Sequence, residues 1–328
     1  MRHLRFSLAC LLTFAAPVMF WQPALADWPA RVFSPYFFLD AGDHMTLQDC
    51  YAATGQKYFT LAFIIADHAG NPTWNGHIPM SQNRYADQIR AIRAAGGDVS
   101  VSFGGAAGEE IATVSDSAQA LAAKYELVID QYKLIWIDFD IEGRALDNTS
   151  ANQRRNAAIQ LLQTKYPALL VSFTLPADPT GLSDSALALL SDAKSRGVKV
   201  HLVNPMTMDF GPEYAAGKTE SAVSIATVQK VHEQVSGIDP QIPIGATAMI
   251  GQNDERAEIF TSDDATTLQN WSAQQPWMTF LSFWSANRDN GKPSRRHAGD
   301  TSSGIKQTPW QFTRMWMGFT GKADAPTR

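Results

Sequence analysis

The sequence predicts an α/β protein built as a single-domain (β/α)8 TIM barrel. Eight short apolar runs alternate with helical patterns along the 328 residues. Regular alternation of strands and helices is typical of a parallel sheet covered by helices. Eight such units in about 300 residues favour a closed barrel over an open sheet. No Gly-x-Gly-x-x-Gly turn follows the first run, which argues against a dinucleotide-binding sheet.

The elements follow one another in a regular order. Strands are expected, in chain order, over residues 32–37, 58–66, 98–104, 134–142, 169–175, 198–208, 242–250 and 278–284. Helices are expected over 82–95, 117–131, 151–166, 183–196, 221–235 and 264–273, with a weak first helix over 46–54 and a closing helix over 309–318. Only one helix fits between the seventh and eighth strands, so we expect no α+β insertion there.

The first residues have the pattern of an export signal. Arg2 and Arg5 make a positive start, residues 8–20 are apolar, and Ala24-Leu25-Ala26 is a small-x-small cleavage site. We therefore predict a signal peptide over 1–26 and a secreted or periplasmic protein that does not stay inserted in a membrane. An uncleaved N-terminal anchor is the alternative. The barrel domain is expected over 27–320 and a C-terminal tail over 321–328.

Charge and cysteine content narrow the possible partners. The 27 basic residues include Arg2 and Arg5, so residues 27–328 carry 25 basic against 32 acidic side chains, a net charge of −7. That balance argues against nucleic acid or an anionic membrane surface as the partner. Cys50 is the one cysteine after residue 26, and we expect it to be a buried core residue. No pattern requires a cofactor or a metal, and we expect a monomer.

The fourth expected strand carries a row of acids. Side chains alternate faces along a strand, so Trp136, Asp138, Asp140 and Glu142 point to one side, which in a barrel is the inside. Functional groups of such barrels lie at the carboxyl ends of the strands, and Glu142 lies nearest that end. A charged neighbour raises the pKa of an acid. We therefore expect Glu142 to be a general acid, Asp140 its charged partner, and Asp138 to share a proton with Asp140.

Two other interpretations of the acidic row remain. Three carboxylates suit a hard divalent cation, although no His or Asn lies beside them in the sequence. The row could also be a structural cluster paired with Arg144 or Lys133.

Four motifs resemble those of the glycoside hydrolase family 18 chitinases. Asp138-Phe139-Asp140-Ile141-Glu142 is similar to the family's Asp-x-x-Asp-x-Asp-x-Glu, and Ser102-Phe103-Gly104-Gly105 to its Ser-x-Gly-Gly. Met206-Thr207-Met208-Asp209 resembles Met-x-Tyr-Asp on the sixth strand, and Trp284 the tryptophan that ends the eighth strand. The variants Asp-Phe-Asp-Ile-Glu and Met-Thr-Met-Asp resemble bacterial and archaeal members most.

The resemblance implies retaining hydrolysis assisted by the substrate's own 2-acetamido group. Glu142 would protonate the glycosidic oxygen, and Asp140 would orient the acetamido N–H. Ser102 would hydrogen-bond Asp138. Trp284 would form the apolar floor under the sugar, and Asp209 would contact the acetamido group or sugar hydroxyls. The implied partner is chitin or an oligosaccharide that contains N-acetylglucosamine.

Two positions depart from the family pattern. The first Asp of the acidic motif is Ile135, which faces away from the barrel interior by parity. The Tyr that holds the acetamido oxygen is Met208, and a thioether is a weak acceptor and no donor. Gln252, after the seventh strand, is a further candidate sugar contact. Trp74 and Trp271 are either sugar platforms or core residues.

Three functions follow as hypotheses. The first is an exported chitinase that cleaves β-1,4-linked N-acetylglucosamine. The second is a carbohydrate-binding protein with weak activity on the same barrel, which Met208 favours and Glu142 opposes. The third is an endo-N-acetylglucosaminidase.

Overall fold

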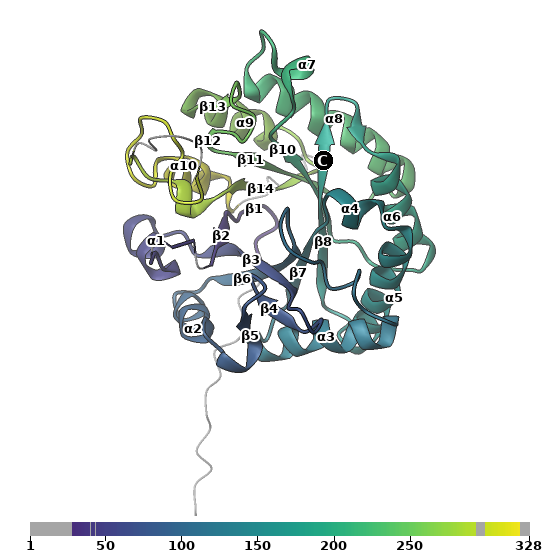
Figure 1. Cartoon of the computed structure of the whole chain (residues 1–328). Coiled ribbons are helices and arrows are strands. Elements are labelled where there is room, and N and C mark those ends of the chain that lie inside the picture. The colour runs from purple at the N-terminus through teal and green to yellow at the C-terminus, as the bar shows by residue number, and fades with distance from the viewer. Residues whose placement is uncertain (1–27, 40, 43, 293–298, 322–328) are drawn as a thin grey trace, which may run out of the picture.

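A closed barrel of parallel strands forms the centre of the molecule, and helices surround it (Figure 1). The computed structural model describes residues 28–39, 41–42, 44–292 and 299–321. The expected signal peptide and all but the first residue of the expected tail lie outside the described residues.

The barrel wall follows the predicted alternation closely. Its strands are β1 (Val32–Phe33), β2 (Tyr36–Phe38), β3 (Tyr58–Ala66), β6 (Asp98–Gly104), β7 (Trp136–Asp140), β8 (Leu170–Asp178), β10 (Leu202–Thr207), β11 (Ile244–Met249) and β14 (Met278–Trp284). The predicted first strand is divided into two short pieces at Pro35, which has no backbone N–H to donate. One piece closes the barrel against the last strand and the other pairs with the second, since β1 is parallel to β14 and β2 is parallel to β3.

The helices cover the outside of this wall. They are α1 (Leu47–Thr54), α2 (Ala86–Ala94), α3 (Ala118–Tyr132), α4 (Gly143–Asp147), α5 (Thr149–Lys165), α6 (Asp184–Ser195), α7 (Pro212–Ala215), α8 (Glu220–Ile238), α9 (Ser262–Ala273) and α10 (Gln311–Trp316). Single turns of 3-10 helix occur at Met80–Gln82, Ala286–Arg288 and Met317–Phe319. Hydroxyl side chains cap several starts: those of Ser117, Ser183, Thr219 and Thr261 each accept a hydrogen bond from the backbone of the first turn.

Short additional strands lie in the loops. They are β4 (Pro72–Trp74), β5 (Ile78–Pro79), β9 (Gly181–Leu182), β12 (Gly251–Gln252) and β13 (Ile259–Phe260). The segment from β11 to β14 consists of the β12–β13 hairpin and α9, so the predicted absence of an α+β insertion there is confirmed.

The barrel interior is layered along its axis. A buried apolar layer at the amino-terminal end consists of Val32, Tyr58, Trp136, Leu202 and Phe280. Trp136 therefore fills the core, as its low position on the strand predicted. Polar side chains lie above this layer, and the acids of β7 are among them. On the outward face of β7, Phe139 packs against Tyr125 of α3, with ring centroids 5.1 Å apart.

Three further sequence predictions can be compared with the structure. Cys50 is fully buried, as expected. Trp74 is also fully buried and donates from Nε1 to the Tyr132 hydroxyl, 2.9 Å away, so it is a core residue and no sugar platform. Trp271 packs against the hydrophobic core. Within the described residues, no helix combines the length and the apolar character needed to cross a bilayer.

Candidate active site

The acidic row lies at the carboxyl end of β7, with its members at successive depths. Asp138 and Asp140 are buried inside the barrel, 3% and 4% exposed. Glu142 follows the strand as the N-cap residue of α4 and is partly exposed. Strand alternation therefore predicted the placement of the row correctly, from the floor at Trp136 to the mouth at Glu142.

A shell of hydroxyl groups surrounds Asp138. Its Oδ2 accepts from Ser102 Oγ at 2.7 Å and from Tyr36 Oη at 2.9 Å. Its Oδ1 accepts from Ser172 Oγ at 2.5 Å, and Thr174 Oγ1 lies 3.0 Å from the same oxygen. Burial raises the pKa of Asp138, and these hydrogen bonds oppose that rise because they stabilise the ionised form. Asp138 is thus the acid of the row best equipped to hold a negative charge.

Asp140 and Glu142 share a hydrogen bond. Burial raises the pKa of Asp140 well above its ordinary value, and the charges of Glu142 and Asp138 on either side raise it further. Burial also raises the pKa of Glu142, the hydrogen bond from Asp140 lowers it, and the charge of Asp209 raises it. Burial and the neighbouring charges thus favour the protonated form of Asp140. The sequence analysis expected a charged Asp140 beside a neutral Glu142, and that assignment stays a prediction.

A cavity of about 1060 Å³ opens above this row. Asp140 and Glu142 line it together with the predicted Met208, Asp209 and Trp284. The buried Oδ1 atom of Asp140 has no hydrogen-bond partner among the described residues. An acidic oxygen without a protein partner at a cavity wall is available to a ligand donor.

The Ser-x-Gly-Gly segment approaches the acidic strand closely. A Cβ on Gly104 would lie 2.0 Å from the Asp140 carbonyl oxygen, and the φ of Gly104 is +106°. The next residue, Gly105, donates its N–H to that same carbonyl at 2.9 Å. Only glycine fits such an approach, so this motif is needed for the contact between β6 and the end of β7.

Two carboxylates hold the segment after β10 in place. Asp209, in the left-handed region at φ +53°, accepts the N–H of Glu255 at 2.9 Å. In return, Glu258 accepts the N–H groups of Phe210 and Gly211 at 2.9 and 2.7 Å. This exchange fixes Asp209 and Met208 at the cavity, and it joins the loop after β10 to the β12–β13 hairpin.

Aromatic rings form one wall of the cavity. Trp284 stacks on Phe63 with centroids 5.5 Å apart and planes at 14°. Phe38 and Tyr36 lie 5.4 and 6.0 Å from the same indole. The wall is apolar and preorganised, which suits the C–H face of a sugar ring.

Two predicted site residues do not line the cavity. Ser102 is fully buried and donates to Asp138, which confirms the hydrogen bond that the resemblance implies, so it positions an acid. Gln252 does not line the cavity either. Its backbone N–H donates to Ser303 at 2.8 Å, and its side chain lies beside Gly304.

The two alternative interpretations of the acidic row find no support in the described residues. In that part of the chain, no three His, Cys, Asp or Glu side chains are grouped so that they could hold a metal ion. The ion pairs found there involve none of the three acids. Arg144 and Lys133 are exposed.

Sequence reasoning missed several cavity residues. Tyr36, Phe63, Asn75 and Tyr214 all line the cavity. Tyr36 lies near the end of the strand expected over 32–37, so the rule that strand ends carry function could have found it. Phe63 and Asn75 meet through a contact between loop and strand, since the Asn75 Oδ1 accepts the Phe63 N–H at 3.1 Å. No local pattern signals such a contact.

The fold and this site define a TIM-barrel protein with an acidic active-site row on its fourth strand. Comparisons with known proteins identify relatives that are named as chitinases. The chain is 31% identical over 281 residues to a probable bifunctional chitinase/lysozyme of Escherichia coli strain K12, and 31% identical over 279 residues to endochitinase 11 of Metarhizium anisopliae. Each match covers 80% of this chain, but only 31% of the bacterial relative and 53% of the fungal one. The chain thus spans about a third and about half of their lengths.

A solved structure matches over nearly the whole barrel. The catalytic domain of a hyperthermophilic chitinase from Pyrococcus furiosus has a TM-score of 0.82 and 32% identity, with 91% of this chain and 97% of that one covered. A family GH18 chitinase from a fern has the same fold at 17% identity and a TM-score of 0.59. No protein-family model matches the chain. On the Pyrococcus match, the chain belongs to glycoside hydrolase family 18, the family of these chitinases.

Proposed function

We propose that the protein is a chitinase that cleaves β-1,4-linked N-acetylglucosamine with retention of configuration, assisted by the substrate's acetamido group. The observation that carries the proposal is the Asp140–Glu142 pair at the cavity, with one oxygen of Asp140 free of protein partners. Relatives named as chitinases and the Pyrococcus domain solved with chito-oligosaccharides support this choice of substrate.

Substrate binding would move the shared proton. In the free protein Asp140 donates to Glu142. An acetamido N–H that approaches Asp140 Oδ1 needs a charged acceptor, so it favours transfer of the proton to Glu142. The protonated Glu142 is then the general acid at the glycosidic oxygen. Asp138, held by its hydroxyl shell, stays ionised, so the row carries a charge of −2 before and after this transfer.

The bond changes follow from this arrangement. The acetamido carbonyl oxygen attacks the anomeric carbon as the glycosidic bond breaks, and the leaving oxygen takes the proton of Glu142. The resulting oxazolinium ion is positive, and the carboxylate of Asp140 stabilises it through the acetamido N–H. A water molecule, deprotonated by Glu142, then opens the ring and restores the acid. Each of the two substitutions inverts the anomeric carbon, so the configuration is retained overall.

Met208 leaves the acetamido oxygen without the tyrosine of the family pattern. We assign the missing donor to Tyr214, which lines the same cavity from α7. A phenol donates one hydrogen bond, as the tyrosine of the family motif would.

Product analysis tests the proposal directly. The protein is incubated with fully N-acetylated and with fully deacetylated oligomers, and the products are separated and their first-formed anomer is determined by NMR. We expect cleavage of N-acetylated oligomers alone, with the β-anomer formed first. Cleavage of deacetylated oligomers at a similar rate would refute acetamido participation. Binding of N-acetylated oligomers without cleavage would favour a carbohydrate-binding protein instead.

The remaining parts of the proposal rest on the sequence. Export rests on residues 1–26 and their cleavage site after Ala26. Action as a monomer likewise stays a proposal from the sequence.

A further inference from the structure

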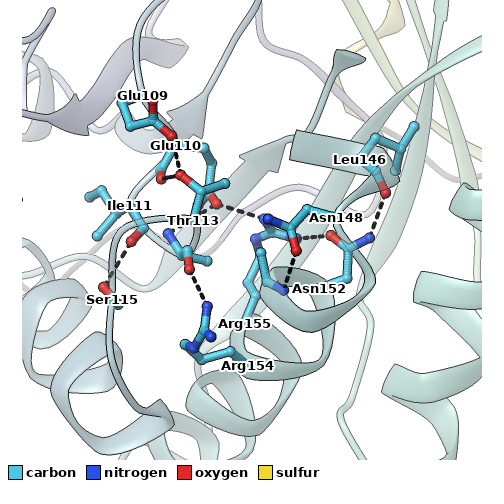
Figure 2. Close-up of polar contacts among 12 residues, drawn as sticks. Glu109, Glu110, Ile111, Thr113, Ser115, Leu146, Asn148, Asn152, Arg154 and Arg155 are labelled. Atoms are coloured by element: carbon cyan, nitrogen blue, oxygen red, sulfur yellow. Dashed lines mark hydrogen bonds and ion pairs between the residues drawn. The ribbon is translucent and has the colours of Figure 1, made fainter. Parts of the chain in front are cut away.

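A fully buried guanidinium lies next to the site without lining the cavity. Arg155 of α5 is 0% exposed, and its Nη2 is 2.7 Å from Glu110 Oε2 (Figure 2). Its Nη1 donates to Asn152 Oδ1 at 2.7 Å. A buried ion pair adds little net stability because both charges lose their hydration, but the loss of one partner is costly.

At one end, Glu110 anchors a wall of the cavity. Its Oε2 also accepts the Ala112 N–H at 3.0 Å. Glu110 is the last residue of a segment that begins at Gly105, whose N–H donates to the Asp140 carbonyl. Residues 106–108 of this segment line the cavity. This segment is thus fastened twice, to the acidic strand at its start and to Arg155 at its end.

At the other end, Asn152 anchors the helix that follows Glu142. Its Nδ2 donates to the Leu146 carbonyl oxygen at 2.6 Å, a bond visible in Figure 2. Leu146 belongs to α4, whose first turn is bonded to the Glu142 carbonyl: the N–H groups of Ala145 and Leu146 donate to it at 3.1 and 3.3 Å. The backbone of Glu142 is therefore tied to Arg155 through α4 and Asn152.

The contacts form a closed circuit around the acid pair. It runs from the Asp140 carbonyl through Gly105 to Glu110, then through Arg155 and Asn152 to α4 and Glu142. We propose that Arg155, with Glu110 and Asn152, is a positioning residue that fixes the general acid Glu142 against the cavity wall. This inference rests on the proposed function. It assigns Arg155 a role that the family motifs do not contain.

The chain offers a matched control at the opposite end of β6. Arg93 Nε lies 2.7 Å from Asp98 Oδ1, and the Asp98 side chain is 0% exposed. Arg93→Met and Arg155→Met each remove a guanidinium and leave a buried carboxylate behind, but only Arg155 connects to Glu142. Both variants are assayed at a temperature where circular dichroism shows them fully folded. Arg155→Lys, which keeps the charge but not both hydrogen bonds, serves if Arg155→Met does not fold.

Two substrates separate acid catalysis from general damage. The leaving group of a chito-oligosaccharide is a sugar hydroxyl, which needs a proton from Glu142. The leaving group of a 2,4-dinitrophenyl chitobioside is dinitrophenolate, a weak base that needs little protonation. We expect Arg155→Met to lower kcat on the oligosaccharide by roughly 10–100-fold, since small misplacements of a reacting group have effects of this size. The dinitrophenyl substrate should lose less than about threefold, and Arg93→Met should change neither rate by more than about threefold.

Each outcome decides the inference. Equal losses on the two substrates, an oligosaccharide rate unchanged in Arg155→Met, or the same selective loss in Arg93→Met would overturn the positioning role. The inference would then fail while the proposed function stands, because the wild-type protein still cleaves both substrates. A wild-type protein that cleaves neither substrate overturns the proposed function, and the inference with it.

Discussion

Removal of the Ser102 hydroxyl should move the acid limb of the pH–rate profile. Ser102 Oγ donates to Asp138 Oδ2 at 2.7 Å, is fully buried and does not line the cavity. The active row carries one proton on three acids, and the acid limb is the uptake of a second proton by the row. Asp138 becomes a stronger acceptor for that proton once the Ser102 hydrogen bond is lost. A hydrogen bond to a charged group contributes about 1.5–3 kcal/mol, and about 1.4 kcal/mol corresponds to one pKa unit. Ser102→Ala should therefore raise the acid limb by about one to two pH units.

The sign follows from the charge states. The lost hydrogen bond stabilised ionised Asp138, so the second proton binds more readily and activity is lost at a higher pH. Asp138 is ionised both before and after the last proton leaves the row, so the alkaline limb should stay within a few tenths of a unit. These limbs belong to the coupled row and not to single residues.

The assay measures kcat/KM on a fluorogenic chito-oligosaccharide across the pH range. Ser100→Ala is the control, because Ser100 is buried two residues earlier on β6 and donates to Thr60 at 3.1 Å, away from Asp138. An acid limb that does not move in Ser102→Ala, or that moves equally in Ser100→Ala, would refute the account of Asp138 as the charged member.

Three further predictions address the core, the pH dependence of stability and the acetamido site. Trp74→Phe should lower the free energy of unfolding by about 1–3 kcal/mol, because it leaves a cavity and removes the hydrogen bond to Tyr132, and KM should not change. Urea titration and steady-state kinetics check this. A raised KM at unchanged stability would contradict it. Burial and the charges of Glu258, Asp264 and Asp209 raise the pKa of Glu220 to about 7. Since its folded pKa exceeds the unfolded value, Glu220 destabilises the fold as the pH rises from about 4.5 to 7. After solvent screening, Glu220→Gln should raise the free energy of unfolding by about 1–2 kcal/mol at pH 8 and by almost nothing at pH 4. Equal increases at both pH values would contradict this prediction. Tyr214→Phe should raise KM for N-acetylated oligomers roughly tenfold, the value of one lost hydrogen bond of about 1.4 kcal/mol; an unchanged KM removes Tyr214 from the acetamido site.

The barrel could be predicted because its signals are local. The ranges expected for β3, β6 and β14 agree with the structure to the residue, since apolar runs between turn residues define buried parallel strands. Boundaries were less accurate where a turn intervenes. The helix expected from residue 82 begins at Ala86, because Asn83 is in the left-handed region at φ +48° and ends a 3-10 turn before it.

The site could be predicted only as far as strand periodicity reaches. Alternation along one strand placed Asp138, Asp140 and Glu142 correctly. The position of their shared proton depends on burial and on hydroxyl groups from other strands, among them Ser172 and Thr174, which are 34 and 36 residues away in sequence. Nothing local in the sequence indicates such contacts, so the strand pattern alone could not predict where that proton lies.

The most direct measurement of the central claim compares turnover and binding in Glu142→Gln. The claim is that Glu142 delivers the proton it shares with Asp140 to the glycosidic oxygen. The account predicts that kcat on an N-acetylated chito-oligosaccharide falls by about a thousandfold or more, while calorimetry finds a Kd within about threefold of that of the wild-type protein. A variant that keeps the wild-type turnover would contradict the account.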